Sequence, residues 1–207
     1  MIIDHVGYLF FPEHVVFRII GRIAFPVFAF FIAEGFLKTK NVNEYLKRLS
    51  IFAVISQAPL FFFDRLAGSS GLTLNIFFTL SLGVLTLLLI TKIKNLPTKI
   101  LGVTAILAIA HFGNFSYGIY GILSILGSYL FLKNRKAGTV TLSLLPFLET
   151  ARLFLVNIFF LQFFAVFSLI PIYFYNGKRG AKISKWIFYW FYPVHLVILS
   201  LIFILLK

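Results

Sequence analysis

The longest hydrophobic stretch of this chain, Val15 to Phe36, contains the charged side chains of Arg18, Arg22 and Glu34. A charged side chain at the centre of a bilayer costs about 2.5–3.5 kcal/mol even on translocon-insertion scales. Such residues therefore tend to face the interior of a helical bundle, where they find partners and mark functional paths. The sequence predicts hydrophobic helices that enclose a polar chamber.

The composition indicates that most of the chain lies in a membrane. Of its 207 residues, 60% are hydrophobic and 12% are charged, and the mean hydropathy is +1.00. These values predict an all-α, polytopic membrane bundle that forms one domain over residues 1–207. Met1 enters an apolar segment almost at once, so we expect no removable signal peptide. The lack of cysteine excludes disulfides, a thiol nucleophile and a cysteine-ligated metal.

Hydrophobic segments alternate with polar loops along the whole chain. About eight or nine are expected, at Ile2–Phe11, Val15–Phe36, Leu49–Phe63, Thr73–Ile90, Ile100–His111, Tyr117–Leu132, Thr139–Phe147, Leu153–Tyr175 and Trp186–Leu206. A spanning helix needs roughly 20 residues, and Ile2–Phe11 and Thr139–Phe147 have about half that number. Each of these two is a full span or a re-entrant or interfacial segment.

Positive charge is concentrated in alternate loops. The formal net charge is +13, and most basic residues fall in four clusters: Lys38, Lys40, Lys47 and Arg48; Lys92, Lys94 and Lys99; Lys133, Arg135 and Lys136; Lys178, Arg179, Lys182 and Lys185. This positive-inside pattern predicts a bacterial-type cytoplasmic membrane, with the N-terminus in the cytoplasm and Lys207 outside. Membrane lipids are the expected partners of these cations, and nucleic acid is not.

Polar residues from three distant segments are expected at similar depth. Counting about 1.5 Å per helical residue places Asp4, His5, Arg22 and His195 roughly 10–13 Å into the membrane. Histidine can serve as a general base or transient acyl acceptor, and a carboxylate can fix its tautomer. The alternative is a polar network that only holds the bundle together. Two further side chains, Gln57 and Thr79, are expected near this group.

Several other polar residues allow both a functional and a structural interpretation. Arg18 and Arg22 share one helix face, which suggests an anionic ligand or a buried acid, although Arg18 could instead reach lipid headgroups. Glu34 is an acid or base, or the partner of Lys38 four residues later. Asn75 and Thr79 lie on a polar stripe of the kind that more often joins helices than binds substrate. We predict no metal site.

Six sequence blocks resemble the TraX family of membrane proteins. They are IDHVG at Ile3–Gly7, FRIIGRIAFPVFAFFIAEGF at Phe17–Phe36, KNVNEYLKRLSIFAVISQAP at Lys40–Pro59, NIFFTLSLG at Asn75–Gly83, YGIYGIL at Tyr117–Leu123 and KWIFYWFYPVHLVIL at Lys185–Leu199. The namesake of the family is a conjugative-plasmid protein that acetylates the N-terminus of pilin. The family is also similar to transmembrane acyltransferases, which move an acyl group from cytoplasmic acyl-CoA to an acceptor at the outer face.

The resemblance implies roles for individual residues. His5 would be the leading catalytic residue, with Asp4 orienting it and His195 as a second polar member of the site. Arg22 would contact the acyl donor, the acceptor or the oxyanion. Substrate binding is assigned to a set of polar residues along the chamber: Arg18, Arg22, Glu34, Gln57, Asn75 and Thr79.

The resulting expectation is a membrane acetyltransferase. Acetyl-CoA would bind at the cytoplasmic side, where basic residues attract its phosphates: Lys38, Lys40, Lys47, Arg48 and Lys185. The acceptor would be an amine or hydroxyl on a pilin-like N-terminus, a glycan or a lipid-linked sugar. Two alternatives are a transporter or channel, in which Asp4, His5, Arg22 and Glu34 relay protons or anions, and a noncatalytic assembly factor for a pilus or secretion apparatus.

Overall fold

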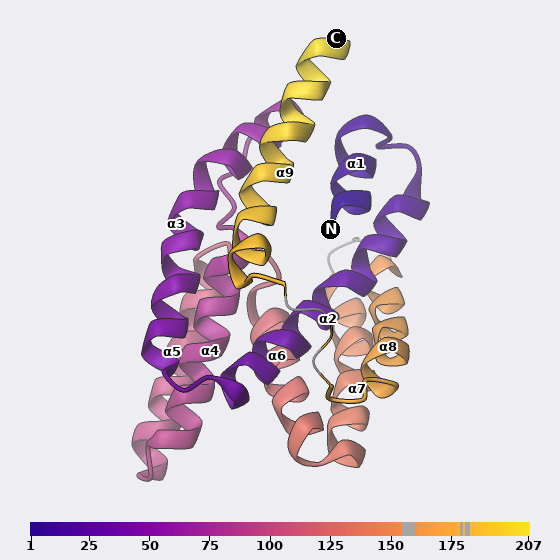
Figure 1. Cartoon of the computed structure of the whole chain (residues 1–207). Helices are drawn as coiled ribbons and strands as arrows, with labels where there is room; N and C mark the ends of the chain where they lie inside the picture. Colours follow the sequence, from indigo (N-terminus) through magenta and orange to yellow (C-terminus); the bar gives the residue numbers. More distant parts are fainter. Residues whose placement is uncertain (155–159, 179, 181–182) are drawn as a thin grey trace.

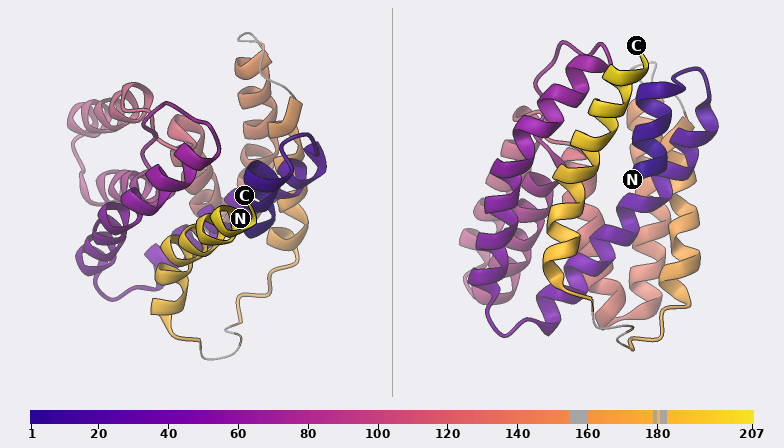
Figure 2. Two further views of the ribbon diagram at one scale, coloured as in Figure 1. Left: turned by 90° about the horizontal axis from the view of Figure 1, so that it is seen from above. Right: turned by 45° about the horizontal axis from the view of Figure 1, so that its top comes forward.

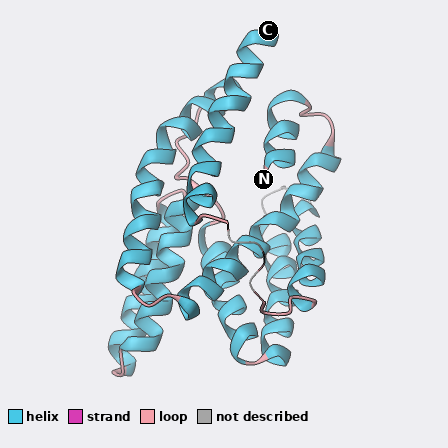
Figure 3. Cartoon of the chain, viewed as in Figure 1, coloured by secondary structure: helices cyan, strands magenta, loops and turns pink. Residues whose placement is uncertain are grey.

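The chain folds into helices joined by short loops (Figure 3). The computed structural model describes residues 1–154, 160–178, 180 and 183–207. In these residues the elements are α1 (Ile2–Phe10), α2 (Val15–Lys38), α3 (Val42–Leu66), α4 (Ile76–Lys92), α5 (Leu96–Phe112), α6 (Gly118–Lys133), α7 (Arg135–Phe154), the 3-10 helix η1 (Phe160–Ser168), α8 (Leu169–Tyr173) and α9 (Lys185–Leu206). The predicted all-α fold is confirmed.

Helix α2 runs diagonally through the middle of the bundle (Figure 1). It packs against α1, α4, α6, η1 and α8, whereas α9 packs mainly on α3 and also touches α1. Ala29 and Ala33 of α2 are fully buried, and small residues of this kind let membrane helices approach closely. The larger Phe25 and Phe30 fill the space beside them and are also buried. This central helix carries Arg18 and Arg22 into the interior.

Among the described residues, three helices are long and apolar enough to cross a membrane: α2, α3 and α9. Shorter apolar helices are α4, α5, α6 and the η1–α8 segment. One face of α9 exposes large apolar side chains, including Ile187, Phe188, Val194 and Leu201. Such a surface suits contact with lipid chains, in agreement with the predicted membrane bundle.

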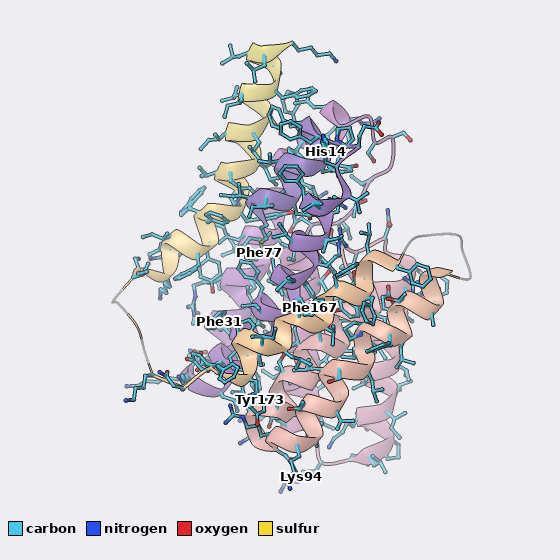
Figure 4. The ribbon with its side chains drawn as sticks, turned by 90° about the vertical axis from the view of Figure 1, so that its right-hand side faces the viewer. His14, Phe31, Phe77, Lys94, Phe167 and Tyr173 are labelled. Carbon is cyan, nitrogen blue, oxygen red and sulfur yellow. The ribbon has the colours of Figure 1, made fainter. Side chains whose placement is uncertain are left out.

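Three of the basic clusters lie at one end of the bundle. The α2–α3, α4–α5 and α6–α7 connections meet at the lower end in the right-hand view of Figure 2, and Figure 4 shows Lys94 at this end and His14 at the other. The fourth cluster is described at Lys178 and Lys185, and its other two members, at positions 179 and 182, lie outside the described residues. We refer to the end with Lys94 as the basic end and to the end with His14 as the opposite end.

The structure differs from the predicted segments at two helices. Helix α7 covers Arg135–Phe154 and is 20 residues long, so the shorter prediction of Thr139–Phe147 was wrong. The helix extends into the polar flanks because the Asn134 side-chain oxygen accepts from the backbone N–H of Ala137 at 3.1 Å before its first turns, and because Glu149 and Arg152 pair near its end. The predicted segment Leu153–Tyr175 is helical from Phe160 to Tyr173, and residues 155–159 lie outside the described part.

The first helix also differs from the expected topology. Met1 lies partway along the bundle, beside α2 and α9, rather than at the basic end where a cytoplasmic N-terminus was expected (Figure 1). The physical reason is length, because the nine residues of α1 rise only about 14 Å, roughly half of the hydrocarbon core. As a consequence, Asp4 and His5 lie in the first turns of a helix that starts inside the bundle.

Close packing of α6 on α7 depends on Gly138. A Cβ atom at this position would lie 2.0 Å from Cα and 2.2 Å from the backbone nitrogen of Phe131. Backbone cannot move aside as a flexible side chain can, so Gly138→Ala is expected to lower the free energy of unfolding by about 1–3 kcal/mol. Thermal unfolding in detergent measures this loss. Gly71→Ala is the matched control, because nothing lies within 4 Å of its added Cβ, and equal midpoints for the two variants would contradict the packing.

Candidate active site

Two histidines from opposite ends of the chain meet inside the bundle. The Nδ1 atom of His5, on α1, lies 2.8 Å from the Nε2 atom of His195, on α9. Their rings stack with centroids 5.0 Å apart, and Phe63 and Tyr192 pack against the His5 ring. The second nitrogen of His195, Nδ1, lies 2.7 Å from the carbonyl oxygen of Phe191. The sequence thus brings together two imidazoles that are 190 residues apart.

Asp4 lies between the two arginines of α2. Its Oδ1 atom is 2.9 Å from Nη1 of Arg18 and 3.7 Å from Nη2 of Arg22. Gly21 permits this approach, because a Cβ atom there would lie 2.4 Å from Asp4 Oδ1. The Arg18 guanidinium also lies 5.0 Å from the ring centroid of Tyr8. Of the two interpretations of Arg18, the structure therefore favours the buried acid over contact with headgroups.

Asp4 does not orient His5 as the sequence interpretation supposed. Adjacent residues on a helix point about 100° apart, so Asp4 turns toward α2 and His5 turns toward α3 and α9. Within the described part of the chain, the ion-pair partners of Asp4 are arginines, and the hydrogen-bond partner of the His5 imidazole is His195. His195, and not Asp4, therefore lies at hydrogen-bond distance from the His5 ring.

A cavity of about 760 Å³ lies beside these groups. Its inner wall includes Asp4, His5, Arg18 and Arg22. It extends to loops at the end opposite the basic clusters, where its lining residues are Asp64, Ser69, His111, Asn114, Phe115, Ser116, Glu149 and Arg152. Glu149 and Arg152 form an ion pair at 2.6 Å on this wall. A polar ligand that enters from this end can therefore reach His5.

Gln162 joins the site from η1, which sequence reasoning missed. Its Oε1 atom is 3.5 Å from Nη1 of Arg22, and its side chain lines the cavity and is buried. Tyr117 lies on the same wall, with its ring centroid 5.9 Å from the Arg22 guanidinium carbon and stacked at 3.8 Å on Phe25. The one available signal for Gln162 was a lone polar residue within an apolar run.

Three predicted substrate-binding residues hold helices and loops together instead of lining the cavity. Gln57 accepts from the backbone N–H of Asn75 at 3.1 Å and donates to the carbonyl of Thr73 at 2.9 Å. The Asn75 amide donates to the Ala53 carbonyl at 2.6 Å. The Thr79 hydroxyl donates to the carbonyl of Ser116. The structure gives these side chains structural partners, and their proposed contact with substrate has no geometric support.

Asn75 is expected to matter for stability. It is fully buried, and its Oδ1 caps α4 by accepting from the backbone N–H of Phe77 at 3.0 Å. Asn75→Ala would remove the donor to the Ala53 carbonyl and leave the buried N–H of Phe77 without its acceptor, so it should lower the free energy of unfolding by about 2–4 kcal/mol. Thermal unfolding in detergent tests this. Asn95→Ala, which removes the exposed cap of α5, is the control and should cost about 1 kcal/mol.

Glu34 lies near the basic end, away from the histidines. It accepts from Lys38 at 2.7 Å and from the Tyr175 hydroxyl at 2.6 Å. Its pairing with Lys38, one of the two interpretations of the sequence, is therefore shown. The hydrogen bond to Glu34 raises the pKa of the Tyr175 hydroxyl. These contacts fasten the end of α2 to the segment that follows α8.

The predicted acetyl-CoA-binding cations also lie outside the cavity lining: Lys38, Lys40, Lys47, Arg48 and Lys185. Lys185 lies 5.6 Å from the ring centroid of Trp186 at the start of α9, and the Arg48 guanidinium lies 6.0 Å from the Tyr45 ring centroid. Among the described residues, no group of three or more histidines and acids could hold a metal ion.

The sequence matches the family model described as TraX protein over residues 1–203. The chain belongs to the TraX family. It is 32% identical over 226 residues to a protein of Dichelobacter nodosus named "Probable fimbrial assembly protein FimC, serogroup H1", and the alignment covers 96% of this chain and 89% of that protein. A TraX-family chain of this kind thus resembles a protein named for fimbrial assembly along nearly its whole length.

A second relative is the "Uncharacterized protein RP591" of Rickettsia prowazekii (strain Madrid E). It is 37% identical over 83 residues, which make up 40% of this TraX-family chain and 30% of that protein. No solved structure matches the chain. Family membership confirms the resemblance inferred from the sequence blocks, and the histidine pair and the cavity add the geometry on which a function can be argued.

Proposed function

We propose that this TraX-family protein is a membrane acetyltransferase in which His5 acts on the acceptor. The observation that carries the proposal is the partly buried His5–His195 pair at the wall of a polar cavity. Burying two imidazoles costs desolvation free energy, and the apolar area that they bury returns little of it. Their presence in a membrane bundle therefore favours a chemical role. The family resemblance supplies the reaction class.

The hydrogen bonds assign the tautomers of both rings. A carbonyl oxygen can only accept, so Nδ1 of His195 carries the proton that is donated to Phe191. In the neutral ring Nε2 of His195 then holds a lone pair and accepts from Nδ1–H of His5. The Nε2 atom of His5 is left with its lone pair, which is the state that a general base or nucleophile requires. His195 is therefore a positioning residue.

The reaction then follows from ordinary acyl-transfer chemistry. Nε2 of His5 removes a proton from the acceptor amine or hydroxyl, whose lone pair attacks the thioester carbonyl carbon of acetyl-CoA. The C–S bond breaks, and the CoA thiolate leaves and takes the proton from His5. Arg22, at the same cavity wall, is placed to stabilise the negative charge on the tetrahedral oxygen. In the alternative course, Nε2 itself attacks the thioester and carries the acetyl group to the acceptor.

The direction of transfer is part of the proposal. With the basic end in the cytoplasm, the cavity faces outward, and the acceptor enters between the outer loops. Acetyl-CoA would be drawn to the basic end by its cations. The acetyl group would then have to pass along α2 to reach His5, which lies roughly half a membrane away from that end.

Labelled acetyl-CoA tests this function. Purified protein is incubated with it, and mass spectrometry locates any acetyl group on His5 or on an added acceptor, first a synthetic pilin-like peptide with a free N-terminus and then a glycan. Transfer to an acceptor supports the proposal, and an acetylated His5 selects the covalent course. Turnover that is equal in wild type and His5→Ala would exclude His5 from the chemistry.

The name of the Dichelobacter nodosus relative favours a second candidate, an assembly factor without catalysis. Under this hypothesis the protein would bind a fimbrial subunit and leave it chemically unchanged. Copurification of a fimbrial subunit that carries no acetyl group, together with no consumption of acetyl-CoA, would favour assembly over catalysis.

A further inference from the structure

Two buried hydrogen-bond donors at the cavity wall have no acceptor. Nε of Arg22 and Nε2 of Gln162 are both buried and have no acceptor within 3.5 Å among the described residues, although the Gln162 side chain also lies near the Tyr120 hydroxyl. Both side chains line the cavity, and they touch each other through Gln162 Oε1 and Arg22 Nη1. A buried donor left unpaired costs about 1–3 kcal/mol, and more when it is charged. Two such donors side by side indicate that a ligand supplies the acceptor.

The charges at this wall do not balance. Arg18 and Arg22 bring two positive charges, and Asp4 is the carboxylate that pairs with them among the described residues. The other two acids of the cavity lining do not pair with these arginines. Glu149 pairs with Arg152, and Asp64, on α3, forms no ion pair within the described part of the chain. One positive charge at Arg22 is therefore uncompensated in a membrane interior, where an unpaired charge costs several kcal/mol.

The excess charge is present in the resting protein. An oxyanion formed during acyl transfer would neutralise it only for the life of a tetrahedral intermediate. A permanent excess charge requires a permanent counterion or a ground-state anionic group of the substrate. This requirement would hold for any reaction in the cavity, so the inference goes beyond acyl transfer.

We propose that Arg22 and Gln162 form a binding site for an anionic group, a carboxylate or a phosphate; its assignment to the acceptor molecule rests on the proposed acetyl transfer. The two donors match its oxygen atoms: the guanidinium contributes charge and Nε–H, and the Gln162 amide contributes a neutral N–H. Asp4 holds the other edge of Arg22 and fixes the direction of the guanidinium. The cavity accordingly selects acceptors that bear a negative charge as well as the reacting amine or hydroxyl.

Binding of simple anions tests the site without any acyl chemistry. Sodium phosphate and sodium acetate are titrated into purified protein in detergent, at constant ionic strength balanced with sodium chloride, and the thermal unfolding midpoint is recorded. A saturable rise of the midpoint in wild type is expected. Gln162→Leu should raise the apparent Kd at least about tenfold, because the loss of one hydrogen bond to a charged group weakens binding by more than a factor of ten. Phosphate acting at lower concentration than acetate indicates a phosphate-bearing acceptor, and the reverse order indicates a carboxylate.

Gln162→Glu provides the sharper variant. It places a carboxylate beside Arg22 and supplies the missing negative charge from within the protein. Its midpoint without added anion should exceed that of wild type, and its response to anions should disappear. Arg65→Gln is the matched control, because this exposed arginine stacks on Phe61 outside the cavity lining; its anion response should equal that of wild type.

Two results would overturn this proposal. One is an anion response of wild-type size in Gln162→Glu, and the other is no saturable response in wild type. Neither result touches the acetyl-transfer experiment, since the probes carry no acyl thioester. Conversely, if the protein binds phosphate through Gln162 but consumes no acetyl-CoA, the anion-site proposal stands and the proposed acetyl transfer is wrong.

Discussion

His5→Ala is expected to lower the rate of acetyl transfer by about a thousandfold, within the range of 10² to 10⁴ that general acid–base catalysis contributes. The variant removes the imidazole that lines the cavity beside Arg22 and is hydrogen-bonded to His195. The measurement is the initial rate of acetyl transfer from labelled acetyl-CoA to the acceptor identified in the labelling experiment. His14→Ala is the matched control, because His14 lies in the loop between α1 and α2 and is exposed.

Substitutions of His195 separate positioning from chemistry. His195→Ala removes the acceptor for Nδ1–H of His5, which frees the His5 ring to change tautomer and direction, so a smaller loss is expected than for His5→Ala. His195→Gln should recover part of that loss, because its amide oxygen can accept the same hydrogen bond. If His195→Ala lost as much as His5→Ala and His195→Gln recovered nothing, His195 would take part in the chemistry itself.

Asp4→Asn is expected to be the most destabilising change near the site. It removes the carboxylate that pairs with Arg18 and Arg22, and breaking a buried pair by removing one partner costs about 3–5 kcal/mol. The free energy of unfolding should fall by that amount. Glu13→Gln is the control, because Glu13 is exposed in the loop before α2 and should change stability by less than about 0.5 kcal/mol.

A double variant distinguishes charge from packing. Asp4→Asn combined with Arg18→Gln restores the net charge of the group to that of wild type, so it should recover a large part of the lost stability. Thermal unfolding of the two single variants and the double variant forms a double-mutant cycle. Additive losses from the two substitutions would show that the ion pair contributes little.

Part of the site could be predicted because membrane depth is readable from sequence. Helical rise and the positions of the basic clusters placed His5, Arg22 and His195 at similar depth, and the structure brings all three to one region. Depth does not give direction around a helix axis. The pairing of Asp4 with Arg18 and Arg22, in place of His5, depends on which way α1 faces, and that is set by its packing on α2.

Other features have no local sequence signal. Gln162 lies in a 3-10 helix, and its role appears only once η1 is packed against α2. From sequence, the polar stripe at Asn75 and Thr79 was compatible with helix contact and with substrate binding. The hydrogen bonds to the carbonyls of Ala53 and Ser116 favour helix contact. Helix α7 is longer than its apolar run because hydropathy measures transfer into lipid, whereas the Asn134 side chain at its start and the Glu149–Arg152 pair near its end stabilise helical turns made of polar residues.

The position of Tyr117 in the site depends on how tightly α2 and α6 pack together. This bulky residue adopts left-handed backbone angles, with φ of 63°, a conformation that costs of order 1–3 kcal/mol and persists only where the surroundings enforce it. Its ring is clamped by Phe25 beneath the Arg22 guanidinium. Loosening of the α2–α6 contact, by heat or by a remote substitution, would let the backbone relax and carry the ring away from the arginine. The proposed acetyl transfer should therefore be lost on warming before the helices themselves unfold.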